Sequence, residues 1–84
     1  MHAPELIALA QRRIAERLLP DTAPSATFGG QSDGAPCAVC AQRIEPGKVE
    51  LELEWGPRGA ERTLLMHPTC HAAWLSALHP LVTV

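Results

Sequence analysis

The chain has 84 residues, with nine acidic side chains against seven lysines and arginines and a formal net charge of −2. This length allows one domain at most, and a core of that size barely offsets the cost of ordering the chain, about 1.5 kcal/mol per residue. The charge disfavours a general nucleic-acid binder, because such domains are usually basic. No stretch reaches the roughly 18 consecutive apolar residues of a membrane span.

Cysteine usage and composition indicate the compartment. Three cysteines cannot all pair within one chain, so a reducing environment and a metal site are favoured over a disulfide framework. The first residues show no charged-then-apolar signal segment. We therefore expect a cytoplasmic protein, and the six arginines against a single lysine are typical of a GC-rich bacterial genome.

Residues 4–19 are predicted to form an amphipathic helix. Pro4 suits the first helical turn, where its missing N–H costs nothing. Ile7, Ile14 and Leu18 recur at helical spacing and form an apolar stripe. We expect this stripe to pack on the rest of the chain or on a second copy, with docking on a foreign protein as the alternative. These three residues are thus the candidate partner-binding residues.

Residues 20–36 are predicted to be a flexible linker. They hold three prolines, three glycines and several small polar residues, and Phe28 is their only large apolar side chain. The chain is therefore expected to divide into a helix over 1–19, a linker over 20–36 and a folded module over 37–84.

A β-hairpin is predicted within this module. Apolar residues alternate with three glutamates over 49–55, a period of two that indicates a half-buried strand. A loop over 56–59 and a returning strand over 61–66 complete the hairpin. The pattern leaves open which face of the returning strand is buried. The glutamates are expected on the solvated face: Glu50, Glu52 and Glu54.

A short helix is predicted from Thr69 to about His79, with Pro68 in its first turn and Trp74 in the core. The apolar tail 81–84 then either adds a strand to the sheet or presents a surface to a partner.

Two short pairs contain every cysteine of the chain. Cys37 and Cys40 form a C-x2-C knuckle, and His67 and Cys70 form an H-x2-C pair at the start of the predicted helix. Structural zinc takes four sulfur or nitrogen ligands in a tetrahedron, and two such pairs supply them. His71 stands four residues after His67, another helical ligand spacing, so it is the alternative fourth ligand.

A closed site of four protein ligands leaves no position for water or substrate, so we assign no catalytic residues and expect no enzymatic activity. Zn²⁺ is the expected cofactor. The interpretation favoured for the fold is a small α+β zinc-binding domain: an N-terminal helix and a linker, then a zinc knuckle, a β-hairpin and a C-terminal helix, in a treble-clef-like order.

With these ligands and Trp74, the segment 37–75 resembles two zinc modules. The order C-A-V-C-x3-I-x2-G followed by H-x2-C is similar to the first zinc site of a LIM domain, although no second C-x2-C follows Cys70. The long spacer between the two pairs is closer to the poly(ADP-ribose) polymerase-type zinc finger. The segment also resembles small bacterial treble-clef-like zinc-finger proteins with an H-x2-C-x3-W helix. These resemblances imply a fold and a metal.

The expected function is that of a non-enzymatic, zinc-stabilised adaptor or small regulator acting through contacts with a protein partner or a second copy. Two alternatives stay open. One is a nucleic-acid-binding zinc finger using the arginines at 12, 13, 17 and 43, which the acidic net charge disfavours. The other is a redox sensor in which oxidised thiolates release zinc. No membrane and no small-molecule substrate are expected.

Overall fold

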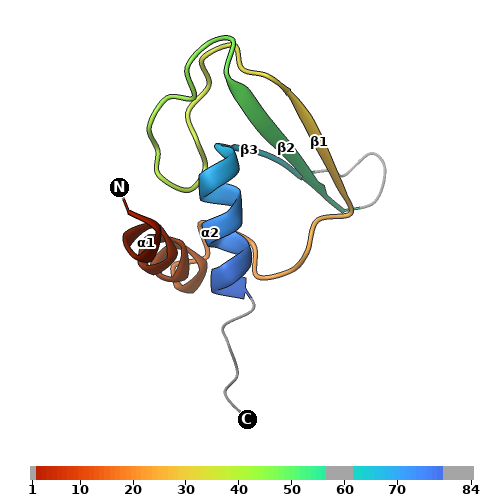
Figure 1. Ribbon diagram of the computed structural model, residues 1–84. Coiled ribbons are helices and arrows are strands. Elements are labelled where there is room, and N and C mark those ends of the chain that lie inside the picture. The colour runs from red at the N-terminus through yellow and green to blue at the C-terminus, as the bar shows by residue number, and fades with distance from the viewer. Residues whose placement is uncertain (1, 57–61, 79–84) are drawn as a thin grey trace.

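Two helices and a three-stranded antiparallel sheet make up the fold (Figure 1). The computed structural model describes residues 2–56 and 62–78. The elements are α1 (Ala3–Ala15), β1 (Ala26–Gln31), β2 (Val49–Trp55), β3 (Arg62–Met66) and α2 (Pro68–Leu78), and the strand order is β1-β2-β3. The predicted α+β class, with knuckle, hairpin and helix in succession, is therefore confirmed. No helix in the described ranges is long and apolar enough to cross a membrane.

Helix α1 ends at Ala15, four residues before its predicted end. Arg17 adopts a left-handed backbone conformation with φ of 63°. Its N–H donates to the carbonyl of Ile14 at 3.0 Å, and the N–H of Leu18 donates to the carbonyl of Arg13 at 2.8 Å. This pair of bonds is the Schellman motif, which usually has glycine in the left-handed position. Because arginine rather than glycine occupies this position, the sequence carries no signal that the helix ends here.

Strand β1 lies within the segment predicted to be a linker, so that prediction is wrong for residues 26–31. The strand pairs along its whole length with β2, from Ala26 opposite Glu54 to Gln31 opposite Val49. The sequence did not indicate this strand, because it contains two adjacent glycines and no alternation of apolar residues. Backbone pairing with a neighbour, rather than a side-chain pattern, is what orders it.

Hydrogen bonds from two tryptophan side chains hold the connection between α1 and β1 in place. The indole N–H of Trp74 donates to the carbonyl of Pro20 at 3.0 Å, and the indole N–H of Trp55 donates to the carbonyl of Thr22 at 2.9 Å. The two indoles contact each other edge to face, with ring centroids 5.6 Å apart. Trp74, which is predicted to lie in the core, and Trp55 thus both hold the segment that precedes the sheet.

The register of the hairpin decides which face of β3 is buried. Leu53 lies opposite Leu64, and Leu51 lies opposite Met66. Side chains of directly opposed residues share a face of the sheet, so these four form one apolar face while Leu65 joins the glutamates on the other. Leu53 and Met66 are fully buried. The strand bounds at 49–55 agree with the prediction, whereas the loop at 57–61 lies outside the described residues.

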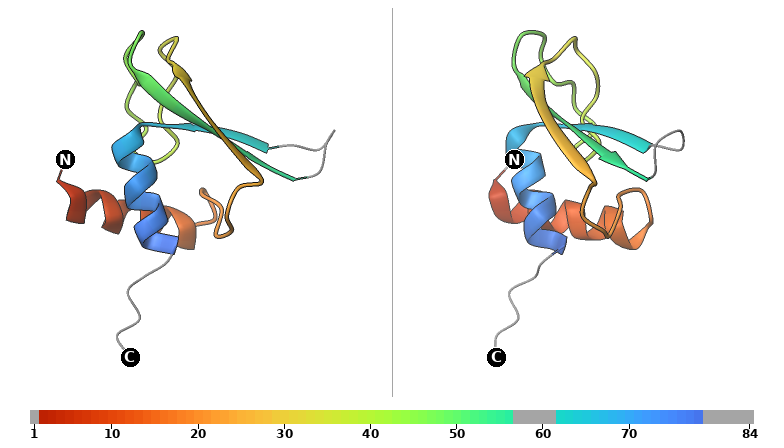
Figure 2. Two further views of the ribbon diagram at one scale, coloured as in Figure 1. Left: turned by 45° about the vertical axis from the view of Figure 1, so that its right-hand side comes forward. Right: turned by 90° about the vertical axis from the view of Figure 1, so that its right-hand side faces the viewer.

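The core forms where α2 meets the sheet, the knuckle and α1. Trp74 is completely buried, and α1 contributes Leu6 and Ala10. Helix α1 crosses α2 on the side away from the sheet (Figure 2). Of the predicted apolar stripe of α1, Ile7 and Ile14 pack partly buried against this core, whereas Leu18 is exposed. The predicted tail over 81–84 lies outside the described residues.

Candidate metal centre

The first ligand pair sits in a tight knuckle between β1 and β2. The N–H of Ala41 donates to the carbonyl of Cys37 at 2.9 Å, and the N–H of Cys37 donates to the carbonyl of Gln42 at 2.8 Å. Ala41 has a φ of 65°, a left-handed conformation that lets the chain reverse directly after the second cysteine. The N–H of Ala38 donates to the carbonyl of Leu65 at 2.8 Å, which fastens the knuckle to β3.

The second ligand pair lies where β3 passes into α2. His67 is the single residue between the strand and the helix, and Pro68 opens the helix. The N–H of His71 donates to the carbonyl of His67 at 2.9 Å, so the helical turn is already formed at this point. Cys70, three residues after His67, therefore lies on the same side of the first turn.

The two pairs converge on one point. The ligand atoms of Cys37, Cys40, His67 and Cys70 all lie within 4.8 Å of one another. The Nδ1 atom of His67 lies 3.5 Å from the sulfur of Cys40 and 3.7 Å from that of Cys70. Zinc–sulfur and zinc–nitrogen bonds of about 2.3 and 2.0–2.1 Å in a tetrahedron give sulfur–nitrogen edges of about 3.6 Å. The four residues therefore fit a tetrahedral metal ion.

The charges of the site also favour a cation. Burial opposes ionisation of Cys37, but the backbone N–H groups of Cys40, His67 and Val39 point to its sulfur, and together they lower its pKa to about 7. Burial raises the pKa of Cys70 well above its usual value, and the neighbouring sulfurs of Cys37 and Cys40 raise it further. Three ionised thiols so close together would repel one another, and a bound divalent cation would remove that repulsion.

His71 stands apart from the cluster. The four-residue group contains Cys70 and does not include His71. The imidazole of His71 lies instead beside the indole of Trp74, with ring centroids 6.1 Å apart. Its partial burial lowers its pKa. Of the two alternatives for the fourth position, the geometry therefore brings Cys70 to the centre.

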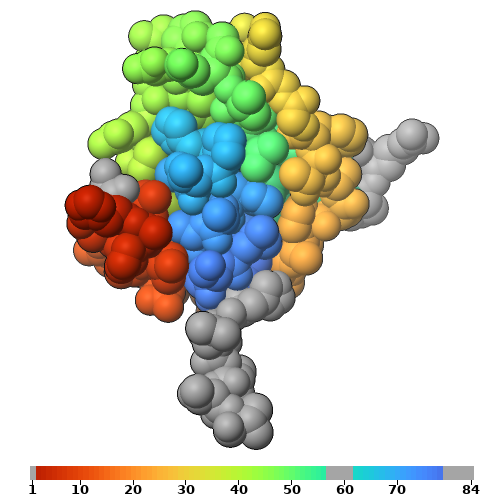
Figure 3. All heavy atoms as spheres, viewed as in Figure 1, coloured from red at the N-terminus to blue at the C-terminus, as the bar shows by residue number. Residues whose placement is uncertain are grey.

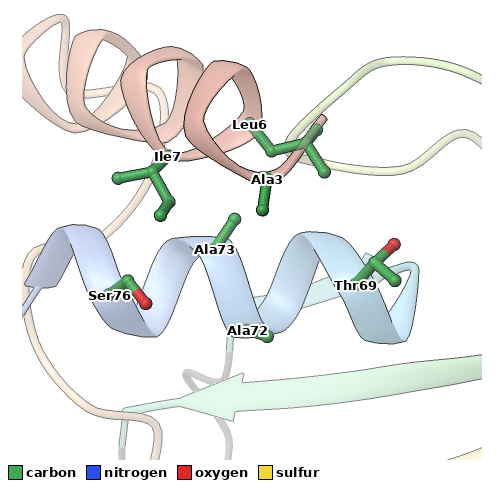
Figure 4. A pocket seen from close by; sticks show the side chains of 7 residues that line it. All are labelled: Ala3, Leu6, Ile7, Thr69, Ala72, Ala73 and Ser76. Carbon is green, nitrogen blue, oxygen red and sulfur yellow. The ribbon is translucent and has the colours of Figure 1, made fainter. Parts of the chain in front are cut away.

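The apolar stripe of α1 is mostly used within the chain. Ile7 and Ile14 are partly buried and pack against the core, while Leu18 is 53% exposed. Helices α1 and α2 lie side by side on one face of the molecule (Figure 3). A cavity of about 320 Å³ lies between them (Figure 4). It is lined by small and apolar side chains: Ala3, Leu6, Ile7, Thr69, Ala72, Ala73 and Ser76. Sequence analysis missed this cavity because it depends on how α1 crosses α2.

Comparison with known proteins adds no family assignment. No protein-family model, curated protein or solved structure matches the chain. The likeness to LIM and poly(ADP-ribose) polymerase-type fingers therefore rests on ligand spacing alone, while the clustering of three cysteines and one histidine rests on the structure.

Proposed function

We propose that the chain is a zinc-stabilised, non-enzymatic adaptor or small regulatory protein that acts through protein–protein contacts. The observation that carries this proposal is the convergence of Cys37, Cys40, His67 and Cys70, whose ligand atoms lie within 4.8 Å of one another. Four protein ligands fill a tetrahedral sphere, as in structural sites, and leave no position at which a substrate could bind the metal.

Zinc is the metal that best suits this donor set. Thiolate and imidazole together in a tetrahedron are typical of structural zinc, whereas magnesium and calcium prefer oxygen ligands. The donors here are three sulfurs and one imidazole nitrogen. Zinc would act as a cross-link between the knuckle and the first turn of α2, two parts of the chain that lie about thirty residues apart.

The energy of that cross-link is large for a chain of this length. Structural zinc binding contributes about 10–16 kcal/mol in zinc-finger peptides. A domain of 84 residues is typically stable by roughly 4–13 kcal/mol in total, at 0.05–0.15 kcal/mol per residue. Removal of the metal is therefore expected to unfold the module rather than to loosen one loop.

Exposed apolar side chains support a role in protein contacts. Within residues 2–56 and 62–78, four large apolar residues are 36–58% exposed: Leu18, Phe28, Val49 and Leu75. Leu18 follows the end of α1, and the others lie on β1, β2 and α2, so they are distributed over several elements. Scattered exposed apolar residues are common, and the proposal therefore depends on the closed metal site first and on these residues second.

The metal half of the proposal is tested by native mass spectrometry of the purified protein, before and after chelation, with circular dichroism recorded in parallel. One zinc ion per chain, lost together with the secondary structure, is the expected result. A folded protein without metal would overturn the proposal.

The absence of catalysis is tested by X-ray absorption at the zinc edge. Three sulfur neighbours and one nitrogen are expected. An oxygen neighbour in place of a protein ligand would indicate an open coordination position and would contradict a purely structural metal.

A further inference from the structure

Strand β1 is an edge strand without the usual protection. Among the strands formed by the described residues it is the outer one in the order β1-β2-β3, and residues 27–31 are exposed there. Natural edge strands commonly carry charged residues or proline that prevent pairing with another chain. The six residues Ala26–Gln31 include neither. The opposite edge of the sheet differs, because the carbonyl of Leu65 on β3 accepts a hydrogen bond from the knuckle.

The hydrogen-bond pattern identifies the backbone groups that face away from β2. The N–H of Ser32, directly after β1, donates to the carbonyl of Lys48 at 2.8 Å and continues the register of the pair. Bonded residues alternate along an antiparallel strand. The even-numbered residues of β1 therefore bond to β2, and the N–H and C=O groups of Thr27, Gly29 and Gln31 point to the free edge.

Neither the backbone conformation nor the space around them, in the described residues, requires glycine at the two positions in the middle of this strand. Neither Gly29 nor Gly30 has a positive φ. A Cβ atom on Gly30 would meet nothing within 4 Å, and one on Gly29 would meet only a methyl group of Leu51 at 4.0 Å. Each glycine costs about 0.5–1 kcal/mol relative to alanine. Glycine in a strand often marks a place where another backbone approaches.

We infer that β1 pairs with β1 of a second copy of this chain, antiparallel and about a two-fold axis at Gly29, so that two three-stranded sheets become one of six strands. This register places Thr27 opposite the partner's Gln31, and all three outward-facing residues then bond reciprocally. Phe28, which is 51% exposed, lies opposite the partner's Gly30. The open space above that glycine accommodates the aromatic ring, a cross-strand arrangement that stabilises glycine in strands.

Charge and area determine how strong this pairing is. The strand is uncharged, and the acidic β2 strands of the two copies would be separated by three strand spacings, roughly 14 Å, which exceeds the Debye length of about 10 Å at 0.1 M salt. Repulsion between the glutamates is therefore weak. Two short strands bury less than the roughly 1,200–2,000 Å² of a stable interface, so the dimer is expected to be concentration-dependent.

This inference deepens the proposed function by naming the partner, and its test separates the two. Sedimentation equilibrium of the full zinc-loaded chain over a wide concentration range is expected to show a mass that rises from 9.0 kDa towards twice that value. The variant Gly29→Pro lacks the central outward N–H but keeps every bond to β2, so it is expected to stay monomeric and to retain zinc. Phe28→Ala is expected to weaken the dimer, and Gln11→Ala, at an exposed position on α1, is the control that is expected to leave it unchanged.

Amide hydrogen exchange gives a second measurement on the unmodified chain. The amides of Thr27, Gly29 and Gln31 are expected to become protected at high concentration only, while those of Phe28 and Gly30 are protected throughout. A zinc-loaded chain that stays monomeric, a dimer insensitive to Gly29→Pro, or amides whose protection does not change with concentration would each overturn the inference. None of these results would affect the metal proposal, which fails only when zinc is absent from a folded chain.

Discussion

The choice between Cys70 and His71 as the fourth ligand yields a sharp prediction. Cys70 is 3% exposed, and its sulfur lies 3.7 Å from Nδ1 of His67, whereas His71 is directed to Trp74 and lies outside the cluster. The binding energy of structural zinc, about 10–16 kcal/mol, shared over four ligands is roughly 2.5–4 kcal/mol for each. Since 1.4 kcal/mol corresponds to a factor of ten, Cys70→Ala is expected to weaken zinc binding about 10²–10³-fold.

His71→Ala is the matched control at the neighbouring position, and it is expected to change zinc affinity less than about tenfold, because it removes no ligand. Both affinities are measured by competition with a colorimetric zinc chelator at fixed pH. A large loss of affinity in His71→Ala, together with near-normal affinity in Cys70→Ala, would refute the assignment. Equal losses in the two variants would show that the ligand geometry described here is wrong.

Three further predictions concern stability and pH. The hydroxyl of buried Ser32 donates to the carbonyl of Ile44 at 2.7 Å and accepts from the N–H of Gly34 at 2.9 Å. Ser32→Ala should therefore lower the free energy of unfolding of the zinc-loaded chain in urea by about 1–3 kcal/mol. Ser76→Ala, at the exposed serine of α2, should lower it by under about 0.5 kcal/mol, and equal losses would contradict this reasoning. Ala41→Gly should stabilise the fold by about 0.5–1 kcal/mol in the same assay, because glycine adopts its left-handed conformation without strain, and a destabilised variant would contradict this reasoning. Zinc affinity should fall as pH is lowered, because each cysteine thiol must lose its proton to bind the metal, and an affinity that does not change with pH would count against thiolate ligands.

Local patterns in the sequence predicted the elements that carry the metal site. The alternation over 49–55 matches β2, and Cys37, Cys40, His67 and Cys70 converge as their spacing indicated. These predictions succeeded because short-range pairs need only one long-range contact to meet.

Features that depend on tertiary contacts were not predictable in the same way. Strand β1 is ordered by pairing with β2 and has no apolar alternation of its own. Helix α1 ends at a left-handed arginine, Arg17, rather than at glycine or proline. The buried face of β3 follows from its register with β2, which no single strand's pattern contains. In each case the deciding interaction lies between segments distant along the chain.

The two tryptophans make the chain its own optical probe. They contact each other edge to face, their indole N–H groups bond the carbonyls of Pro20 and Thr22, and Trp74 lies one helical turn after Cys70. The chain contains no tyrosine and one phenylalanine, a weak emitter, so tryptophan dominates the ultraviolet emission. Loss of the metal or detachment of the α1–β1 connection would expose an indole to water and shift its emission to longer wavelength. Zinc loading and folding can thus be followed in the unlabelled protein, in real time and at low concentration.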